Sequence, residues 1–357
     1  MIQEKNIVVI PGDGIGPEVT SAALTILHAA AERTGMKCNC ATHLAGGAAI
    51  DAHGIPLPAE TVAAARAADA VLLGAVGGPK WDSVTPEIRP EKAILGLRKE
   101  LGLFANLRPV KVTDAMSAYS PLKPERVSGV DILILRELTG GIYFGKRCES
   151  ELIDGVEHAW DTEQYSIPEV ERIVRMAFQA AAGRRGKVTS VDKANVLASS
   201  RLWRRTAGKI ATEFPAIQLE NMYVDNCAMQ LVMAPKALDV VVTGNLFGDI
   251  LTDEAAVITG SIGMLPSASL GSGTGLYEPI HGSAPDIAGK QLANPLGTIL
   301  SVAMMFRHSL ANEAAAVLIE KAVEKVLAAG YRTGDMMQEG LTRCSTNEMA
   351  EKVLAAL

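Results

Sequence analysis

The stretch NLFGDILTDEAA, residues 245–256, places two aspartates four positions apart in a segment whose other residues are mostly those of an apolar helix. On a helix, Asp249 and Asp253 share one face, and Glu254 lies beside them. Like charges at this spacing destabilise a helix, and no basic residue in the segment offsets them. The pattern is therefore typical either of a solvated helix face or of two ligands for a cation.

The position of this helix in the chain favours a ligand site. The apolar run DVVVTG (239–244) directly before it predicts a buried strand, so the helix would begin at the carboxyl end of that strand. In open α/β sheets, ligands bind at this edge. Carboxylates there suit Mg²⁺ or Mn²⁺, which prefer oxygen ligands. The spacing by itself leaves both interpretations open.

Short apolar runs alternate with longer helical patterns along most of the chain. Near-continuous apolar strands separated by helices predict an α/β fold with a mostly parallel sheet covered on both faces. The segment 148–166 departs from this rule, because polar and apolar residues alternate there around Asp154 and Gly155, which predicts a protruding hairpin. We expect such a hairpin to act as a dimer arm. The predicted strands are 6–10, 69–76, 130–137, 186–192, 217–224 and 239–244.

Composition excludes several classes of protein. The chain has 357 residues, 48% of them hydrophobic, which fits two medium globular domains or one large one. A net charge of −6 opposes a general nucleic-acid or membrane-surface role. No apolar run is long enough for a membrane span, and the N-terminal residues lack a signal-peptide pattern. The five cysteines show no zinc-site spacing, so we expect ordinary thiols in a cytoplasmic protein.

The first strand-to-helix turn, PGDGIGPE (11–18), only partly matches a dinucleotide-binding fingerprint. Gly12 and Gly14 fit G-x-G-x-x-G, but Pro17 stands where the third glycine is required. No acidic residue follows near positions 38–40 to bind a ribose. Proline is well suited to the first turn of a helix, where its missing N–H costs nothing. The pattern favours a tight turn over a standard Rossmann site, and contact with a cofactor by another route stays open.

Arginines near the ends of predicted elements favour an anionic substrate. Arg98 and Arg108 lie in LGLRKELGLFANLRP (95–109), and Arg136 ends an apolar strand. The planar guanidinium group binds carboxylates through two parallel hydrogen bonds. A surface salt bridge would explain any one of these arginines, but together with the acid pair they indicate a polycarboxylate substrate beside a metal. Tyr143 and Lys193 are candidate proton-transfer groups.

Read together, these residues resemble the isocitrate/isopropylmalate family of metal-dependent β-decarboxylating dehydrogenases. The resemblance runs almost from end to end of the chain, and several of its motifs are highly specific. The matching stretches include GDGIGPE (12–18), GAVGGPKWD (74–82), RELTGGIYFG (136–145), DKANVL (192–197), GNLFGDILTDEAA (244–256) and EPIHGSAPDIAGK (278–290).

The resemblance implies a non-Rossmann, isopropylmalate/isocitrate dehydrogenase-like α/β fold with two domains, a central mostly parallel sheet and a protruding hairpin arm. Residues 1–103 plus 260–357 would form the cofactor-binding domain from both chain ends. Residues 104–259 would form the dimerisation and metal/substrate domain, with the arm at about 148–166. Substrate and metal would bind in the cleft between the domains of a homodimer that shares its active sites between subunits.

The resemblance also implies NAD and Mg²⁺ or Mn²⁺ as cofactors. Asp249 and Asp253 of one subunit would bind the metal together with Asp225 of the other. Lys193 and Tyr143 would be the catalytic residues. The residues implied for the substrate are Glu91, Ile94, Leu95, Arg98, Arg108, Arg136, Asn195, Val196 and Asp225. The residues implied for the cofactor are Ile15, Gly78, Glu278, His281, Gly282, Ser283, Ala284, Asp286, Ile287 and Asn294.

The activity that the resemblance implies is the NAD-dependent oxidative decarboxylation of 3-isopropylmalate in leucine biosynthesis. Asp286 would accept hydrogen bonds from the adenosine ribose, and an acid there disfavours NADP. Ile94 and Leu95 lie one helical turn before Arg98, which favours an apolar substituent on the substrate. The alternatives in the same family are dehydrogenases of D-malate or tartrate, homoisocitrate and isocitrate.

A protein of another class, a catalytically inactive regulatory subunit, is also an alternative. Such a subunit should have lost Lys193, Tyr143 or one of the predicted metal aspartates. All of them are present. We therefore expect an active enzyme that binds no nucleic acid and no membrane.

Overall fold

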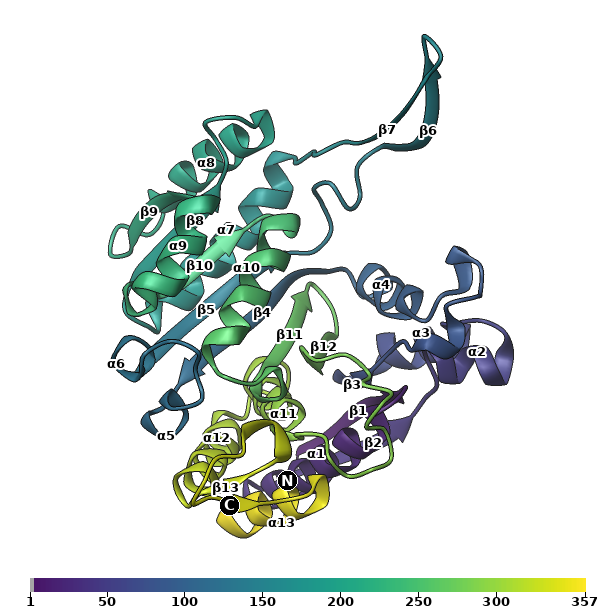
Figure 1. Cartoon of the computed structure of the whole chain (residues 1–357), viewed down its shortest axis with the longest axis vertical. Coiled ribbons are helices and arrows are strands. Elements are labelled where there is room, and N and C mark those ends of the chain that lie inside the picture. Colours follow the sequence, from purple (N-terminus) through teal and green to yellow (C-terminus); the bar gives the residue numbers. More distant parts are fainter. Residues whose placement is uncertain (1–2) are drawn as a thin grey trace. The chain divides into compact units, whose positions relative to one another are not determined.

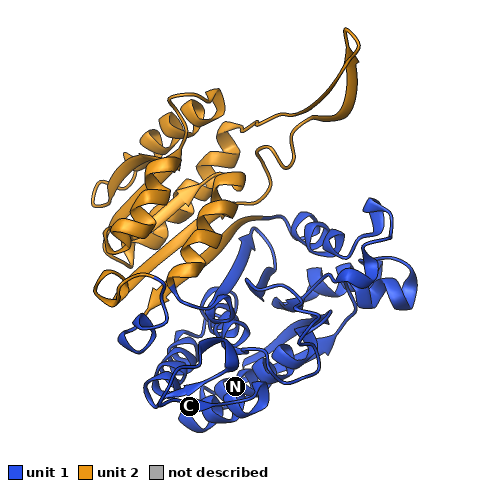
Figure 2. Cartoon of the chain, viewed as in Figure 1, with its two compact units in different colours: residues 1–103, 113–121, 259–357 blue, residues 104–112, 122–258 orange. Residues whose placement is uncertain are grey.

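The computed structural model describes residues 3–357, which divide into two compact units (Figure 2). Unit 1 contains the residues up to Leu103, Thr113–Pro121 and Thr259–Leu357, and unit 2 contains Phe104–Val112 and Leu122–Ile258. Both ends of the chain therefore belong to unit 1. This division differs from the expected one in the short segment Thr113–Pro121 and in Thr259, both of which belong to unit 1.

The segment Thr113–Pro121 belongs to unit 1 because of specific contacts. Its Tyr119 hydroxyl accepts a hydrogen bond from Nε of Arg332 at 3.0 Å, and Nη2 of the same arginine donates to the carbonyl of Ala115 at 3.0 Å. Arg332 is 2% exposed. A side chain at Gly260 would lie 2.5 Å from the carbonyl oxygen of Tyr119. Such contacts between residues far apart in the chain carry no local sequence pattern.

The sheet of unit 1 has the strand order β2-β1-β3-β12-β11. The first four strands are parallel, and β11 is antiparallel to β12. A separate parallel pair, β13 with β14, lies near the C-terminus. The strands are β1 (Gln3–Gly12), β2 (Met36–Thr42), β3 (Ala70–Ala75), β11 (Pro266–Gly271), β12 (Gly275–Pro279), β13 (Tyr331–Arg332) and β14 (Thr342–Arg343).

Helices cover both faces of this sheet (Figure 1). On one face α1 and α11 pack together against the strands, and α12 and α13 pack onto them. On the other face α3 and α4 bury Ala65, Ala93 and Leu97 against Val8 and Ile10 of β1. The helices of unit 1 are α1 (Gly16–Arg33), α2 (Gly47–His53), α3 (Ala59–Ala67), α4 (Glu91–Glu100), α5 (Asp114–Ser117), α11 (Leu296–His308), α12 (Glu313–Ala328) and α13 (Thr346–Ala356).

The sheet of unit 2 has the order β4-β5-β10-β8-β9, with β4 antiparallel to β5 and the other strands parallel. Helices α7 and α8 pack together, and α9 packs with α10 (Figure 1). Because the chain reverses its direction across the sheet after β9, right-handed connections place these two pairs on opposite faces. The elements are β4 (Leu103–Val112), β5 (Val130–Glu137), β8 (Lys187–Asp192), β9 (Gln218–Tyr223), β10 (Val240–Thr243), α6 (Pro124–Val127), α7 (Ile167–Ala182), α8 (Ala198–Ala211), α9 (Val224–Met233) and α10 (Asn245–Ile258).

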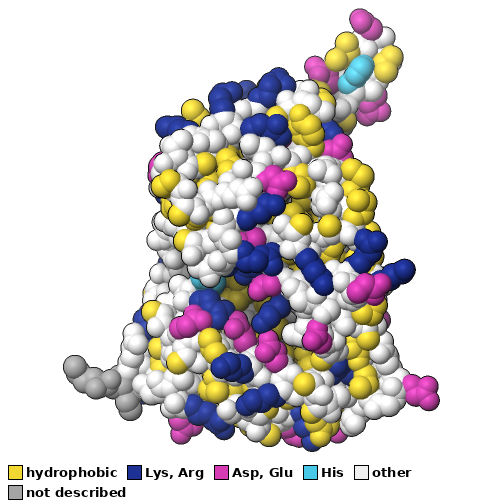
Figure 3. Space-filling view, turned by 90° about the vertical axis from the view of Figure 1, so that its left-hand side faces the viewer, with side chains coloured by type: hydrophobic (Ala, Val, Ile, Leu, Met, Phe, Trp, Pro, Cys, Tyr) yellow, Lys and Arg dark blue, Asp and Glu magenta, His cyan; other side chains and the backbone are white. Residues whose placement is uncertain are grey.

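A hairpin of β6 (Arg147–Ile153) and β7 (Val156–Asp161) projects from unit 2 (Figure 1), which confirms the predicted hairpin. Asp154 and Gly155 at its turn have φ values of 53° and 78°, as a tight hairpin turn requires. Apolar and acidic side chains are both displayed on its surface (Figure 3). In the described part of the chain, no helix is long and apolar enough to cross a membrane.

Gly12, at the end of β1, lies very close to the end of the neighbouring strand β3. Its φ is +71°, and a side chain there would lie 1.8 Å from the carbonyl oxygen of Ala75. Gly35 also has a φ of +71°, but no atom lies within 4 Å of its missing side chain. Gly35→Ala should therefore lower the free energy of unfolding by about 1–2 kcal/mol, the cost of the left-handed backbone alone.

We predict that Gly12→Ala lowers the free energy of unfolding by about 2 kcal/mol more than Gly35→Ala, because the backbone must shift to admit the methyl group. Urea unfolding of the two variants and the parent protein measures the difference. Equal losses in the two variants would show that the close approach to Ala75 costs nothing.

Candidate functional site

Arg136, at the end of β5, lies across the first turn of α10. Its Nε and Nη2 donate to Oδ1 of Asn245 at 3.0 and 2.9 Å, and its Nη1 donates to Asp249. The side chain of Arg136 is 8% exposed. A side chain at Gly248 would lie 2.6 Å from Cγ of Arg136, so the absence of one lets the arginine cross the helix. The first aspartate of the acid pair is thus neutralised by a nearly buried guanidinium group.

Tyr143 binds the same aspartate from another side. Its hydroxyl donates to Oδ2 of Asp249 at 2.8 Å, and its ring lies 5.8 Å from the guanidinium carbon of Arg136. Partial burial, and then the hydrogen bond to Asp249, raise the pKa of Tyr143 above its ordinary value. The phenol is therefore held protonated beside a carboxylate, as a proton donor must be.

Arg108, on the neighbouring strand β4, pairs with the second aspartate. Its Nη1 donates to Oγ1 of Thr252 at 2.7 Å and lies 3.3 Å from Oδ1 of Asp253, while its Nε donates to Asn106 at 2.7 Å. The side chain of Asp253 is 69% exposed and that of Asp249 37% exposed. Each carboxylate of the acid pair therefore has an arginine partner and also an accessible surface.

Lys193 and Asp225 form a second group in unit 2. Nζ of Lys193 lies 2.9 Å from Oδ2 of Asp225, and this hydrogen bond lowers the pKa of the carboxyl group. Lys193 follows β8, and Asp225 lies in the first turn of α9. Asn195 and Val196 lie in the turn between β8 and α8, where Val196 is 63% exposed.

The three predicted metal ligands do not come together within one chain. Among residues 3–357, no group of three or more His, Cys, Asp and Glu side chains is placed to hold a metal ion. Asp249 and Asp253 supply oxygen donors from one face of α10, which suits Mg²⁺ or Mn²⁺. The donor set fits such an ion, provided that a further oxygen ligand such as Asp225 comes from a second chain.

In unit 1, Arg98 lies at the end of α4 beside Glu278 of β12. Its Nη2 lies 3.2 Å from Oε1 of Glu278, and the two side chains are 18% and 15% exposed. Glu91, two turns earlier on α4, places its carboxylate 2.8 Å from where a side chain at Gly77 would begin. The next residue, Gly78, has a φ of +154°. The predicted residues Glu91, Gly78, Arg98 and Glu278 thus belong to neighbouring elements of one unit.

Ile94 and Leu95, both predicted to contact the substrate, differ in their exposure. Ile94 is partly buried and packs against the core cluster beneath α4, whereas Leu95 is 43% exposed. Consecutive residues on a helix point about 100° apart, so one of them turns to the core and the other to solvent. Leu95 is therefore the better candidate for contact with an apolar substrate group, and Ile94 is mainly a core residue.

The first turn packs directly on the predicted cofactor loop. The backbone N–H of Ile15 donates to the carbonyl of Ser283 at 2.8 Å. A side chain at Gly14 would lie 2.0 Å from that carbonyl oxygen, which accounts for the glycine. Ile15 also packs in a small apolar cluster with Ala284 and Ile287. The sequence motif that fails as a Rossmann fingerprint therefore supports a different loop.

The same loop carries a buried polar atom without a protein partner. Nδ1 of His281 lies 3.0 Å from the carbonyl of Gly282, while Nε2 is buried and has no hydrogen-bond partner. Burial lowers the pKa of His281, which favours the neutral imidazole. No atom lies within 4 Å of a side chain built at Gly282, and Asp286 is exposed. A buried nitrogen beside open backbone and an exposed acid fits a polar cofactor such as a dinucleotide.

These arrangements agree with a family comparison. The model of the isocitrate/isopropylmalate dehydrogenase family matches residues 6–353. The chain belongs to this family.

Members of the family that resemble the chain include the 3-isopropylmalate dehydrogenases of Clostridium acetobutylicum and Bacillus licheniformis, which are 57% and 58% identical to it. These similarities cover 100% and 99% of the chain and 100% and 96% of those proteins. Among solved structures, isocitrate dehydrogenase from Methylococcus capsulatus has a TM-score of 0.86 at 36% identity over 99% of both chains. A β-decarboxylating dehydrogenase from Thermococcus kodakarensis has a TM-score of 0.82 at 36% identity, over 99% of this chain and 96% of that one. The predicted fold class is confirmed.

Sequence reasoning missed Asp13, although it lies between the two glycines of the first turn. Asp13 is 4% exposed, and its carboxylate accepts backbone N–H bonds from Gly47, Ala48 and Gly77 at 2.8, 2.7 and 2.8 Å. Burial raises its pKa, and these bonds offset part of the effect. In this member of the dehydrogenase family, Asp13 ties the first turn to the start of α2 and to the loop after β3. The sequence signal that could have identified Asp13 is an acidic residue between two glycines of a tight turn.

Sequence reasoning also left the segment 330–340 unassigned. Asp335 in this segment accepts a hydrogen bond from Nδ2 of the predicted cofactor residue Asn294 at 3.0 Å. Oδ1 of Asn294 in turn accepts from the backbone N–H of Leu296 at 3.0 Å, so both ends of its amide are held. Asp335 therefore orients Asn294, a role that no local sequence pattern indicates.

The hydrogen bond between Tyr143 and Asp249 has a measurable consequence. We predict that Asp249→Asn lowers the pKa of Tyr143, because a neutral amide no longer repels the phenolate. Ultraviolet titration of phenolate formation measures this pKa. The signal of Tyr143 is the difference between a protein that contains it and the same protein with Tyr143→Phe. Asp154→Asn, at the exposed turn of the hairpin, is the control and should leave it unchanged. A pKa that stays the same in Asp249→Asn would contradict the contact.

Proposed function

We propose that this protein catalyses the NAD-dependent oxidative decarboxylation of (2R,3S)-3-isopropylmalate to 4-methyl-2-oxopentanoate and CO₂, a cytoplasmic step of leucine biosynthesis. The cluster of Arg136, Tyr143 and Asp249 is the observation that supports this most directly. In it, a guanidinium group suited to carboxylates and a protonated phenol meet at Asp249 of α10, the acid that would bind the metal. Relatives at 57–58% identity over nearly their full length carry the name of this enzyme.

The substrate is a dicarboxylate, and the three arginines provide its recognition. Arg98, Arg108 and Arg136 would bind the two carboxylates, for which their planar donors are suited. Asp249 and Asp253 would hold Mg²⁺ or Mn²⁺ with Asp225 from a second subunit. When bound, the cation would polarise the C2 oxygen and NAD would accept the hydride from C2.

The proton transfers are the task of the protein's own side chains. Lys193 would remove the proton of the C2 hydroxyl while the hydride leaves, and its donors then remain beside the new carbonyl oxygen. Loss of the C3 carboxylate as CO₂ leaves its bonding electrons on an enolate. Tyr143 would donate its proton to C3 of this enolate, which completes the 2-oxo acid. The hydrogen bond from Tyr143 to Asp249 at 2.8 Å keeps this donor in place.

NAD would be held by unit 1. Ile15, Glu278, Asn294 and the loop 281–287 would form the site, with Gly78 on the neighbouring loop. Gly282 leaves room for the close approach of a pyrophosphate. The exposed carboxylate of Asp286 would accept from ribose hydroxyls and repel a 2′-phosphate, so NAD is preferred to NADP.

A homodimer would complete the site. Helices α9 and α10 expose large apolar side chains, among them Met229, Met233, Ile250 and Val257, which are 53%, 55%, 58% and 58% exposed. Large exposed apolar side chains on two helices that pack together are typical of an interface. Covering it with a second copy would bring Lys193 and Asp225 of the partner subunit to Asp249. This arrangement would add a third carboxylate ligand, since residues 3–357 of one chain contain no group of three placed to hold a metal ion.

The substrate specificity provides the first test. Burying the three extra carbons of the isopropyl group is worth about 2.4 kcal/mol at about 0.8 kcal/mol per carbon. With purified protein, NAD and Mg²⁺, we predict that kcat/KM for 3-isopropylmalate exceeds that for D-malate by at least about tenfold. Isocitrate should be essentially unused, because its third carboxylate would be buried without a partner. An equal kcat/KM for D-malate and 3-isopropylmalate would favour a D-malate or tartrate dehydrogenase. Turnover of homoisocitrate would favour a homoisocitrate dehydrogenase.

Leu95 should carry part of this preference. We predict that Leu95→Ser lowers kcat/KM for 3-isopropylmalate by several-fold while leaving that for D-malate nearly unchanged, because only the isopropyl group contacts this side chain. Ile55→Ser is the matched control, since Ile55 is 45% exposed and Leu95 is 43% exposed. A loss of the same size on both substrates would instead indicate damage to the fold.

Subunit mixing tests the shared site. Lys193→Ala and Asp249→Asn should each be inactive alone. A heterodimer of the two would contain one site with both changes and one intact site, so we predict recovery of up to about half of the activity per heterodimer. Exchange of subunits is verified with distinct affinity tags. Verified heterodimers that stay inactive would reject a site built from two chains.

A further inference from the structure

Tyr165 lies beside the first residue of α10, the helix that carries both aspartates. Its side chain is buried, and its hydroxyl oxygen accepts the backbone N–H of Asn245 at 2.7 Å. A side chain at Gly244 would lie 3.1 Å from that hydroxyl oxygen. Asp249 lies four positions, about one helical turn, after Asn245, so this contact fixes the turn of helix that carries Asp249.

The same ring supports the turn that carries Tyr143. A side chain at Gly140 would lie 2.6 Å from Cε1 of Tyr165, and one at Gly141 would lie 2.7 Å from its hydroxyl oxygen. Gly141 also has a φ of +75°, which favours glycine independently. The turn therefore follows the surface of the Tyr165 ring, and the position of the ring sets the path of the backbone that leads to Tyr143.

The residues directly before Tyr165 hold this turn at both ends. The carbonyl of Gln164 accepts the N–H of Gly141 at 3.0 Å. The N–H of Thr162 donates to the carbonyl of Lys146 at 2.8 Å, and a side chain at Gly145 would lie 1.8 Å from the carbonyl oxygen of Thr162. The segment 162–165, which we call the strap, is the chain that returns from the hairpin arm.

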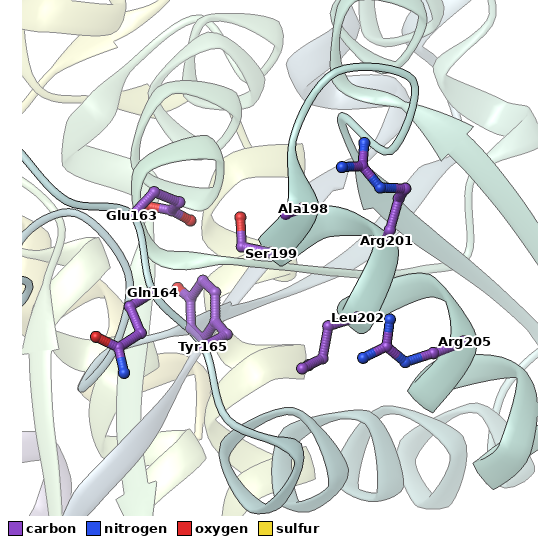
Figure 4. A pocket seen from close by; sticks show the side chains of 8 residues that line it. All are labelled: Glu163, Gln164, Tyr165, Ala198, Ser199, Arg201, Leu202 and Arg205. Carbon is purple, nitrogen blue, oxygen red and sulfur yellow. The ribbon is translucent and has the colours of Figure 1, made fainter.

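The strap is not held by close packing on all sides. Tyr165 borders a shallow hollow of about 440 Å³ that Glu163 and Gln164 share with the first turns of α8 (Figure 4). None of the predicted site residues lines this hollow. On another side the ring makes an edge-to-face contact with Trp203 at 5.4 Å. The contact with Trp203 and the hydrogen bond to Asn245, together with the turn at 140–141 that packs on the ring, set its position.

We propose that Tyr165 is a positioning residue that sets the geometry between Tyr143 and Asp249. It contacts both elements whose relative placement determines the 2.8 Å hydrogen bond of that pair. It acts through Tyr143 and does not touch the reacting atoms. The inference rests on the proposed function, because it assumes that Tyr143 delivers the proton to the enol carbon.

The test is Tyr165→Phe, which removes the hydroxyl and keeps the ring. We expect kcat for 3-isopropylmalate to fall about fivefold, the factor that corresponds to one ordinary hydrogen bond, while KM changes less than about twofold. In a Tyr143→Phe background, the same change should cause no further loss of residual turnover, because the group being positioned is absent.

Tyr277→Phe is the matched control. Tyr277 is fully buried in unit 1, and its hydroxyl lies 2.6 Å from Oγ of Ser309. Both phenylalanine variants should lower Tm to a similar extent, but only Tyr165→Phe should lower kcat. A drop in kcat that follows Tm in both variants would overturn the inference.

The outcomes separate the two proposals. If Tyr143→Phe keeps the parent kcat, the proposed proton donor is wrong and the inference falls with it. If Tyr143→Phe is impaired but Tyr165→Phe keeps the parent kcat, the inference alone is overturned. Independent, multiplying losses in the double variant would also overturn it, because Tyr165 would then act by a route other than Tyr143.

Discussion

The pairing of two helical aspartates with two strand arginines is the interaction on which the site depends. Asp249 and Asp253 would repel each other on α10, and Arg136 and Arg108 offset this repulsion. The arginines come from antiparallel neighbours, β5 and β4, where Asn106 lies opposite Arg136. Removing one partner of such a pair leaves the other charge desolvated and uncompensated, which is costly. In the proposed function these pairs would place carboxylate-binding cations beside metal-binding acids, so that charge balance and substrate recognition would share one arrangement.

Close backbone approach is the second constraint on the site. Gly248 lets Arg136 cross α10, and Gly140 and Gly141 let a turn lie on the ring of Tyr165. These glycines are not hinges, because the neighbouring side chain fills the space that each of them leaves. The strap (162–165) connects the ring of Tyr165 to the last strand of the hairpin, β7. A contact that orders the arm between subunits would therefore also act on the turn that carries Tyr143.

Much of the fold could be predicted from local patterns. The runs of apolar residues became β1, β3, β5, β8, β9 and β10, and the turn at Asp154 and Gly155 formed the hairpin. Strands β2, β4, β11, β12, β13 and β14 were outside the prediction. Polar residues and glycine dilute the apolar content of several of them, as in MKCNCAT and PSASLG. Their positions in the sheet depend on pairing with strands distant in sequence, for which local periodicity carries no signal.

The sequence by itself determined the chemical identity of the candidate site: the acid pair, the arginines, the lysine and the tyrosine, together with the family to which they belong. Only the tertiary structure decided which groups meet. It paired Asp249 with Arg136 and Tyr143, turned Ile94 to the core and Leu95 to solvent, and attached Asp335 to Asn294. The physical reason is the separation along the chain over which each kind of interaction acts. Periodicity and turn chemistry act over a few residues, whereas these contacts join residues tens to more than a hundred positions apart, and packing of the whole chain sets them.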